Sequence, residues 1–78
     1  MVTIIEACPA EGYSSWDHLL TGREADGVIG RQFRTVRAAC DAADREVQKE
    51  ADRRAVSGGA HVVLTLKLAD GSLVHRTT

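Results

Sequence analysis

Residues 61–78 read HVVLTLKLADGSLVHRTT, and this stretch decides the fold. In its first half, apolar residues recur at every second position, which is the period of a strand with one face buried. The predicted buried face holds Val62, Leu64, Leu66 and Leu68, and the other face holds His61, Thr65 and Lys67. Asp70-Gly71 follows, and Asp-Gly between β-prone segments favours a hairpin because glycine accepts the positive φ of a type I′ turn. The stretch therefore predicts two strands, over 61–69 and 72–76.

Upstream of this hairpin, the sequence predicts one long helix over about residues 35–56. Residues 36–55 hold many helix-forming side chains and neither glycine nor proline. Thr35 is a suitable N-cap, and Ser57-Gly58-Gly59 supplies a glycine stop. Apolar residues at steps of three and four form a stripe made of Val36, Ala39, Cys40, Ala43, Val47 and Ala51. Most of these side chains are small, so the helix axis is expected to lie close to a sheet.

This stripe fails near its end, where Glu50 and Arg54 fall on the same line. One interpretation is a solvated helix end with a Glu50–Arg54 ion pair at i,i+4. The other is that the last turns overhang the sheet or meet a polar neighbour.

The N-terminal half is predicted to add three strands. Residues 1–8 are rich in β-branched side chains and end at Pro9. Residues 16–23 alternate in polarity and precede Asp26-Gly27 and Val28-Ile29, which favours a hairpin, although Ser14 or Ser15 is also able to cap a short helix there. Ile29 and Phe33 are expected to face the core together. Both Ala-Asp-Gly stretches, 25–27 and 69–71, are interpreted as turns and not as binding loops.

Together these elements predict a single α+β domain over residues 1–78, in the order β-β-β-α-β-β. An antiparallel sheet of four to five strands would carry the helix on one face and leave the other face open. The sequence leaves open whether the first strand pairs with the first hairpin or the second.

Composition narrows the class of protein. Apolar residues make up 44% of 78 residues, a fraction typical of a folded domain, but only three side chains are aromatic, which predicts a thin core. The net charge of −1 argues against strong nucleic-acid binding. No apolar run reaches the ~20 residues of a membrane span, and the N-terminus does not resemble a signal peptide. We therefore expect a cytoplasmic protein in which Cys8 and Cys40 are free thiols.

The sequence offers no converging set of catalytic groups, so we expect a protein that is not an enzyme and has no cofactor. Gly22, Gly27 and Gly30 match no phosphate-binding loop. His61 and His75 stand on the two arms of the C-terminal hairpin and would need a third ligand to bind a metal. We interpret them as exposed or edge histidines and predict no metal site.

The helix face opposite the apolar stripe is the main candidate for binding. It carries Asp41, Gln48 and Asp52, flanked by Asp44 on one side and by Arg45 and Lys49 on the other. This pattern is typical of a solvated mixed-charge surface, and it also fits an acidic strip that engages a basic groove of a partner. The predicted partner-binding residues are Asp41, Asp44, Gln48 and Asp52, with Trp16 and Tyr13 as aromatic anchors.

The segment RQFRTVRAACDAA, residues 31–43, resembles the DUF2188 family of small bacterial domains. In that pattern a strand ends in an aromatic residue, a threonine caps a helix, and an Asp-Gly hairpin follows. Several phage-encoded anti-CRISPR proteins are similar in this layout. The resemblance spans residues 22–76 and carries over no functional residue. Together with the small size, the lack of a catalytic set and the acidic helix face, it favours a small protein that binds a larger one, such as an inhibitor that blocks the basic nucleic-acid channel of a bacterial defence complex.

Two other functions remain open at this point. One is a nucleic-acid-binding module that uses Arg23, Arg31, Arg34 and Arg37 around Phe33. The other is a homodimer that pairs exposed edge strands.

Overall fold

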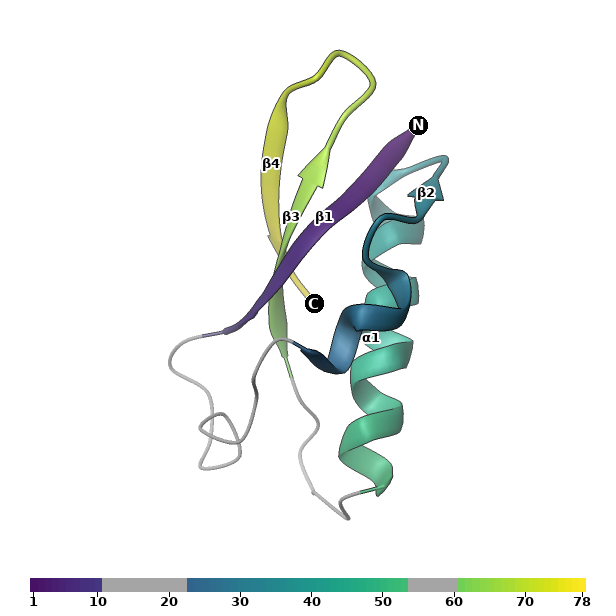
Figure 1. Ribbon diagram of the computed structural model, residues 1–78, viewed down its shortest axis with the longest axis vertical. Coiled ribbons are helices and arrows are strands. Elements are labelled where there is room, and N and C mark those ends of the chain that lie inside the picture. The colour runs from purple at the N-terminus through teal and green to yellow at the C-terminus, as the bar shows by residue number, and fades with distance from the viewer. Residues whose placement is uncertain (11–22, 54–60) are drawn as a thin grey trace.

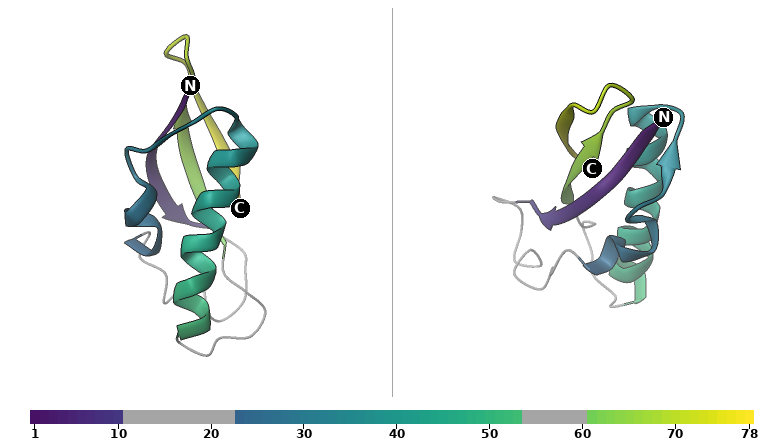
Figure 2. Two further views of the ribbon diagram at one scale, coloured as in Figure 1. Left: turned by 90° about the vertical axis from the view of Figure 1, so that its right-hand side faces the viewer. Right: turned by 45° about the horizontal axis from the view of Figure 1, so that its top comes forward.

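The computed structural model describes residues 1–10, 23–53 and 61–78. These residues form an antiparallel sheet and one α-helix, in two layers (Figures 1 and 2). The elements are β1 (Val2–Pro9), the 3-10 helix η2 (Arg23–Val28), β2 (Gln32–Phe33), α1 (Val36–Arg53), β3 (Val62–Lys67) and β4 (Leu73–Thr77). The strand order across the sheet is β2-β1-β3-β4. The α+β class and the four-stranded sheet are confirmed.

The expected order β-β-β-α-β-β is wrong, because the described chain runs β-β-α-β-β and a fifth strand is not among its elements. Where we predicted a hairpin at Asp26-Gly27, the chain forms η2. Ala25 and Val28 lie one 3-10 turn apart and are both buried against the core. The turn comes later, where the Arg31 amide donates to the Val28 carbonyl at 3.1 Å and Gly30 takes a φ of 84°. Residues 16–22 of the predicted strand lie outside the described residues.

Strand β1 lies inside the sheet and pairs with both β2 and β3. A β-bulge at Ile5 shifts the register between Ile4 and Glu6. Because of this extra residue, Ile4 and Ala7 both turn toward the helix, although they are three residues apart.

The strand continues through Pro9, one residue beyond the prediction. Pro9 stands opposite Val62, while the next amide, that of Ala10, donates to the His61 carbonyl at 3.3 Å. The pairing alternates along an antiparallel ladder, so the proline nitrogen points away from β3 and no bond to β3 is lost.

The β3–β4 hairpin follows the prediction closely. Val62, Leu64 and Leu66 are buried on the helix side, and Thr65 and Lys67 face the other way. The turn differs in type: Gly71 donates to the Leu68 carbonyl at 2.9 Å and Leu68 donates to the Ser72 carbonyl at 2.8 Å. This is a three-residue loop that ends on Gly71 at φ 88°, and not a two-residue type I′ turn.

Asp70 holds this loop from its side chain. Its carboxylate accepts hydrogen bonds from the Ser72 amide at 2.9 Å and the Ser72 hydroxyl at 2.6 Å. The hydroxyl and amide bonds to Ser72 lower the pKa of Asp70 below its ordinary value. The Asp-Gly pair is thus a turn, as expected.

Helix α1 begins as predicted, with the Ala38 amide donating to the Thr35 hydroxyl at 3.0 Å. It is described as far as Arg53, and the predicted stop at residues 57–59 lies outside the described residues. Of the predicted stripe, Ala39, Ala43, Val47 and Ala51 are buried and Val36 and Cys40 are half-buried, and Ala42 joins them. Arg53 forms an ion pair with Glu50. Arg54, which we predicted as the partner of Glu50, lies outside the described residues.

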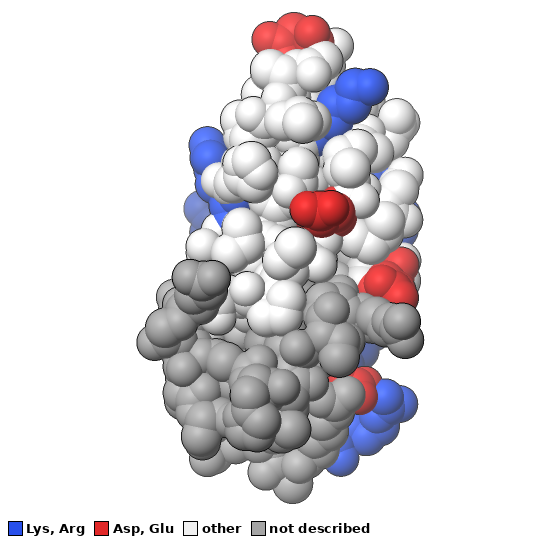
Figure 3. All heavy atoms as spheres, turned by 60° about the vertical axis from the view of Figure 1, so that its left-hand side comes forward, with Lys and Arg blue, Asp and Glu red and all other residues white. Residues whose placement is uncertain are grey.

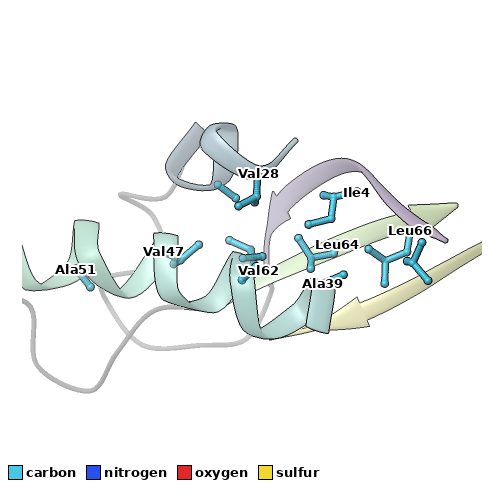
Figure 4. Close-up of a cluster of buried hydrophobic side chains, with 12 residues drawn as sticks. Ile4, Val28, Ala39, Val47, Ala51, Val62, Leu64 and Leu66 are labelled. Atoms are coloured by element: carbon cyan, nitrogen blue, oxygen red, sulfur yellow. The ribbon is translucent and has the colours of Figure 1, made fainter. Parts of the chain in front are cut away.

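The core lies between α1, η2 and the sheet (Figure 4). Its largest fully buried side chains are Ile4, Val28, Val47, Val62, Leu64 and Leu66. Ile29, which follows η2, and Phe33, at the end of β2, pack against this cluster, as predicted. Alanines supply the helix side of the contact, which brings α1 close to the strands.

Candidate protein-binding surfaces

The solvent face of α1 carries the predicted binding residues on one rigid element. Asp41 and Asp52 are exposed, and Asp44 and Gln48 are half-buried. The spacing of three and four residues places all four along one side of the helix. Asp41 and Asp52 lie opposite most of the buried alanines, whereas Asp44 borders the buried face, two turns before Ala51. The Gln48 side-chain amide donates to the Asp44 carboxylate at 3.2 Å. That bond restrains the middle of the row. We call Asp41, Asp44, Gln48 and Asp52 the acidic strip.

Two cationic side chains near the strip, one lysine and one arginine, form ion pairs with glutamates of α1 and not with the aspartates. Lys49 pairs with Glu46 at 3.6 Å, and Arg53 pairs with Glu50. Within the described residues, no ion pair involves any of the three aspartates of the acidic strip. Two glutamates thus neutralise the nearest cations of the last turns, while the aspartate charges remain available.

The same side of α1 also exposes Arg37 and Arg45. Arg37 is one turn before Asp41, and Arg45 is one turn after it. The first half of this face is therefore mixed in charge, and its acidic character is concentrated around Asp44 and Asp52.

The two predicted aromatic anchors, Trp16 and Tyr13, lie outside the described residues. The structure describes the side chains of three of the four arginines that we considered for nucleic-acid binding. Arg31, Arg34 and Arg37 are exposed around β2 and the start of α1, and the guanidinium of Arg31 lies 5.3 Å from the centre of the Phe33 ring. Phe33 is half-buried against the core, and the cation of Arg31 stands over its ring.

The sheet face away from α1 is a surface that the sequence analysis did not single out. Cross-strand partners share a face, so the register gives three rows across this side of the sheet. They are Thr3–Lys67–Leu73, Glu6–Thr65–His75 and Cys8–Val63–Thr77. Ile5, at the bulge, is 43% exposed and Leu73 is 57% exposed. Figure 3 shows the molecule from the side of the sheet, and in its described part uncharged side chains separate the few charged ones.

The structure does not bring His61 and His75 together. His75 is opposite Thr65, whereas His61 is four residues further along the strand and contacts the Thr78 carbonyl at 2.7 Å through Nδ1. In the described part of the chain, no group of three or more histidine, cysteine or carboxylate side chains is placed to hold a metal ion.

The two cysteines are free thiols in different surroundings. Cys8 is exposed, and Cys40 is half-buried on the inner side of α1. Burial raises the pKa of Cys40 above its ordinary value, although the positive charge of Arg76 acts in the opposite direction. The Cys40 thiol therefore stays protonated at neutral pH, which suits packing better than nucleophilic chemistry.

Two further observations concern membrane spans and similarity to known proteins. Among the residues that the structure places, no helix is long and apolar enough to cross a membrane. Comparison of the chain with protein-family models, with curated proteins and with solved structures gave no match in any of the three.

Proposed function

We propose that the protein is a non-enzymatic binding protein that attaches to a basic surface of a larger protein through the acidic strip of α1. The observation that carries the proposal is the pairing pattern on this helix. Lys49 and Arg53 are held by glutamates, whereas Asp41, Asp44 and Asp52 have no ion pair within the described residues. Complementary charge of this kind speeds encounter and selects partners.

A helix is a good scaffold for such a surface, because it fixes the spacing of the charges before binding. The Asp44–Gln48 bond and the buried alanine face restrain α1 further. A partner with lysines or arginines along a groove would meet three carboxylates in a fixed row. Less side-chain entropy is then lost on binding than with a flexible acidic segment.

The concrete version of this proposal is an anti-CRISPR-type inhibitor that blocks the nucleic-acid channel of a bacterial defence complex. Such channels are lined by cations that bind phosphates, and a row of carboxylates competes for the same side chains. The small size of the chain, the acidic strip and the resemblance of residues 22–76 to the layout of anti-CRISPR proteins support this version.

The test compares two variants with equal changes in net charge. Asp41→Asn and Asp52→Asn together neutralise the two exposed carboxylates of the acidic strip. The control variant carries Glu6→Gln and Asp26→Asn, two exposed carboxylates on other elements. After affinity capture from the native host and identification of the partner, we expect the strip variant to bind at least about ten-fold more weakly, since hydrogen bonds to charged groups contribute ~1.5–3 kcal/mol each. Equal binding by both variants would refute the role of the strip.

A nucleic-acid function is the second candidate, and one observation favours it: Arg31, Arg34 and Arg37 are all exposed within seven residues of chain. A mobility-shift titration at several salt concentrations separates the two. Binding that weakens steeply as salt rises would support the arginine surface, because phosphate contacts release counterions. The absence of any shift at low salt removes this candidate and leaves the protein-binding proposal untouched.

A further inference from the structure

Strand β4 is an edge strand whose outer side is unpaired in the described structure. The Leu68 amide donates to the Ser72 carbonyl, and the Thr78 amide donates to the Val62 carbonyl. At both ends of the hairpin, the residues that form hydrogen bonds between its two arms are therefore even-numbered. Because bonded and non-bonded pairs alternate along an antiparallel ladder, Val74 and Arg76 also bond to β3. The amides and carbonyls of Leu73, His75 and Thr77 therefore point outward.

These three outward residues are spaced so that the strand is complementary to itself. When two β4 strands are placed antiparallel about a two-fold axis at His75, each His75 meets the other, and Leu73 meets Thr77 of the second copy. All three pairs use outward backbone groups, so the ladder closes without a shift. We infer that two copies of this chain pair through β4 to form one eight-stranded sheet.

The side chains of β4 fit this arrangement. On the helix side of the strand, Arg76 would stand beside Val74 of the other copy, so the two Arg76 side chains are not opposite each other. On the other side, the paired residues Leu73, His75 and Thr77 are exposed in the single chain and include no carboxylate or ammonium group. The sparsely charged face of the sheet would continue across the axis.

Arg76 is the feature that most directly opposes such pairing. Its guanidinium Nη1 donates to the His75 carbonyl at 2.8 Å, and charged side chains commonly protect sheet edges. However, a carbonyl oxygen has two lone pairs, so it also accepts the amide of the second copy. The short ladder implies a small interface, and we therefore expect dimers that dissociate on dilution.

The two-fold axis at residue 75 gives a sharp test, because that side chain meets its own copy. Sedimentation of the full chain should show a mass that rises with concentration from 8.4 kDa toward twice that value. His75→Lys and His75→Glu should each weaken the dimer about five-fold or more, since like charges directly opposite repel. An equimolar mixture of the two should form mixed dimers at least as tightly as the wild type.

Thr65→Lys and Thr65→Glu are the matched controls, since Thr65 is the β3 partner of His75 on the same face but away from the axis. They should leave the dimer intact. A third variant, His75→Pro, removes an outward amide and no bond to β3, so it should abolish the dimer while the circular dichroism spectrum stays native. Wild-type protein that remains monomeric at every concentration would overturn the inference, as would lysine and glutamate variants that fail to favour each other.

Discussion

Replacing Leu64 with alanine should lower the free energy of unfolding by about 3 kcal/mol, within the range measured for buried leucines. Leu64 is fully buried at the centre of β3, between β1 and β4 and under the helix. The buried residues of α1 are alanines and one valine, which have no long side chain to move into the space. The cavity should therefore persist, and its cost adds to the lost burial of the side chain.

The measurement is urea unfolding followed by circular dichroism, with Leu73→Ala as the control. Leu73 is 57% exposed on β4, so its truncation should change the unfolding free energy by no more than ~0.5 kcal/mol. Small domains have total stabilities of only ~5 kcal/mol, so Leu64→Ala should lose much of the folded state on mild heating. Equal losses in the two variants would show that β3 does not form the centre of the core.

Introducing aspartate at Ala25 should cost several kcal/mol and leave the protein largely unfolded. Ala25 is fully buried in η2, in the core cluster with Val28 and α1, and an unpaired carboxylate there is stripped of water. Truncation of the next residue, Asp26→Ala, is the control, because Asp26 is exposed. Its effect should be within about 0.5 kcal/mol.

This pair of variants also separates the observed 3-10 helix from the hairpin that the Asp26-Gly27 pair suggests. In a hairpin, Ala25 and Asp26 would both belong to an exposed turn, and an aspartate at position 25 would be tolerated. Thermal unfolding with native-state circular dichroism decides between them. If Ala25→Asp were as stable as the wild type, η2 would not pack as described.

The elements that the sequence predicted correctly have local causes. The period of two in β3, the glycine that ends the β3–β4 turn and the Thr35 cap all depend on residues close together in the chain. Helical spacing also placed Asp41 and Asp52 on the exposed side of α1, opposite the buried alanines. Their binding role stays a prediction.

The elements that the sequence missed depend on contacts between distant segments. Asp26-Gly27 favours a turn by itself, yet Ala25 and Val28 pack in the core between η2, α1 and the sheet, which the local sequence does not reveal. The bulge at Ile5 arises from the pairing of β1 with β3, which the run Ile4-Ile5-Glu6 does not reveal. The outward groups of β4 become visible only when the strand order is known.

The most direct test of the proposed function is site-specific photo-crosslinking from the solvent face of α1. A photoreactive residue would replace Arg45, which is exposed one turn after Asp41 and is not among the proposed binding residues. The matched position is Lys67, an exposed cation on the other side of the sheet. We predict a covalent adduct with the captured partner from position 45 and little from position 67. Crosslinking from position 67 with none from position 45 would contradict binding through α1.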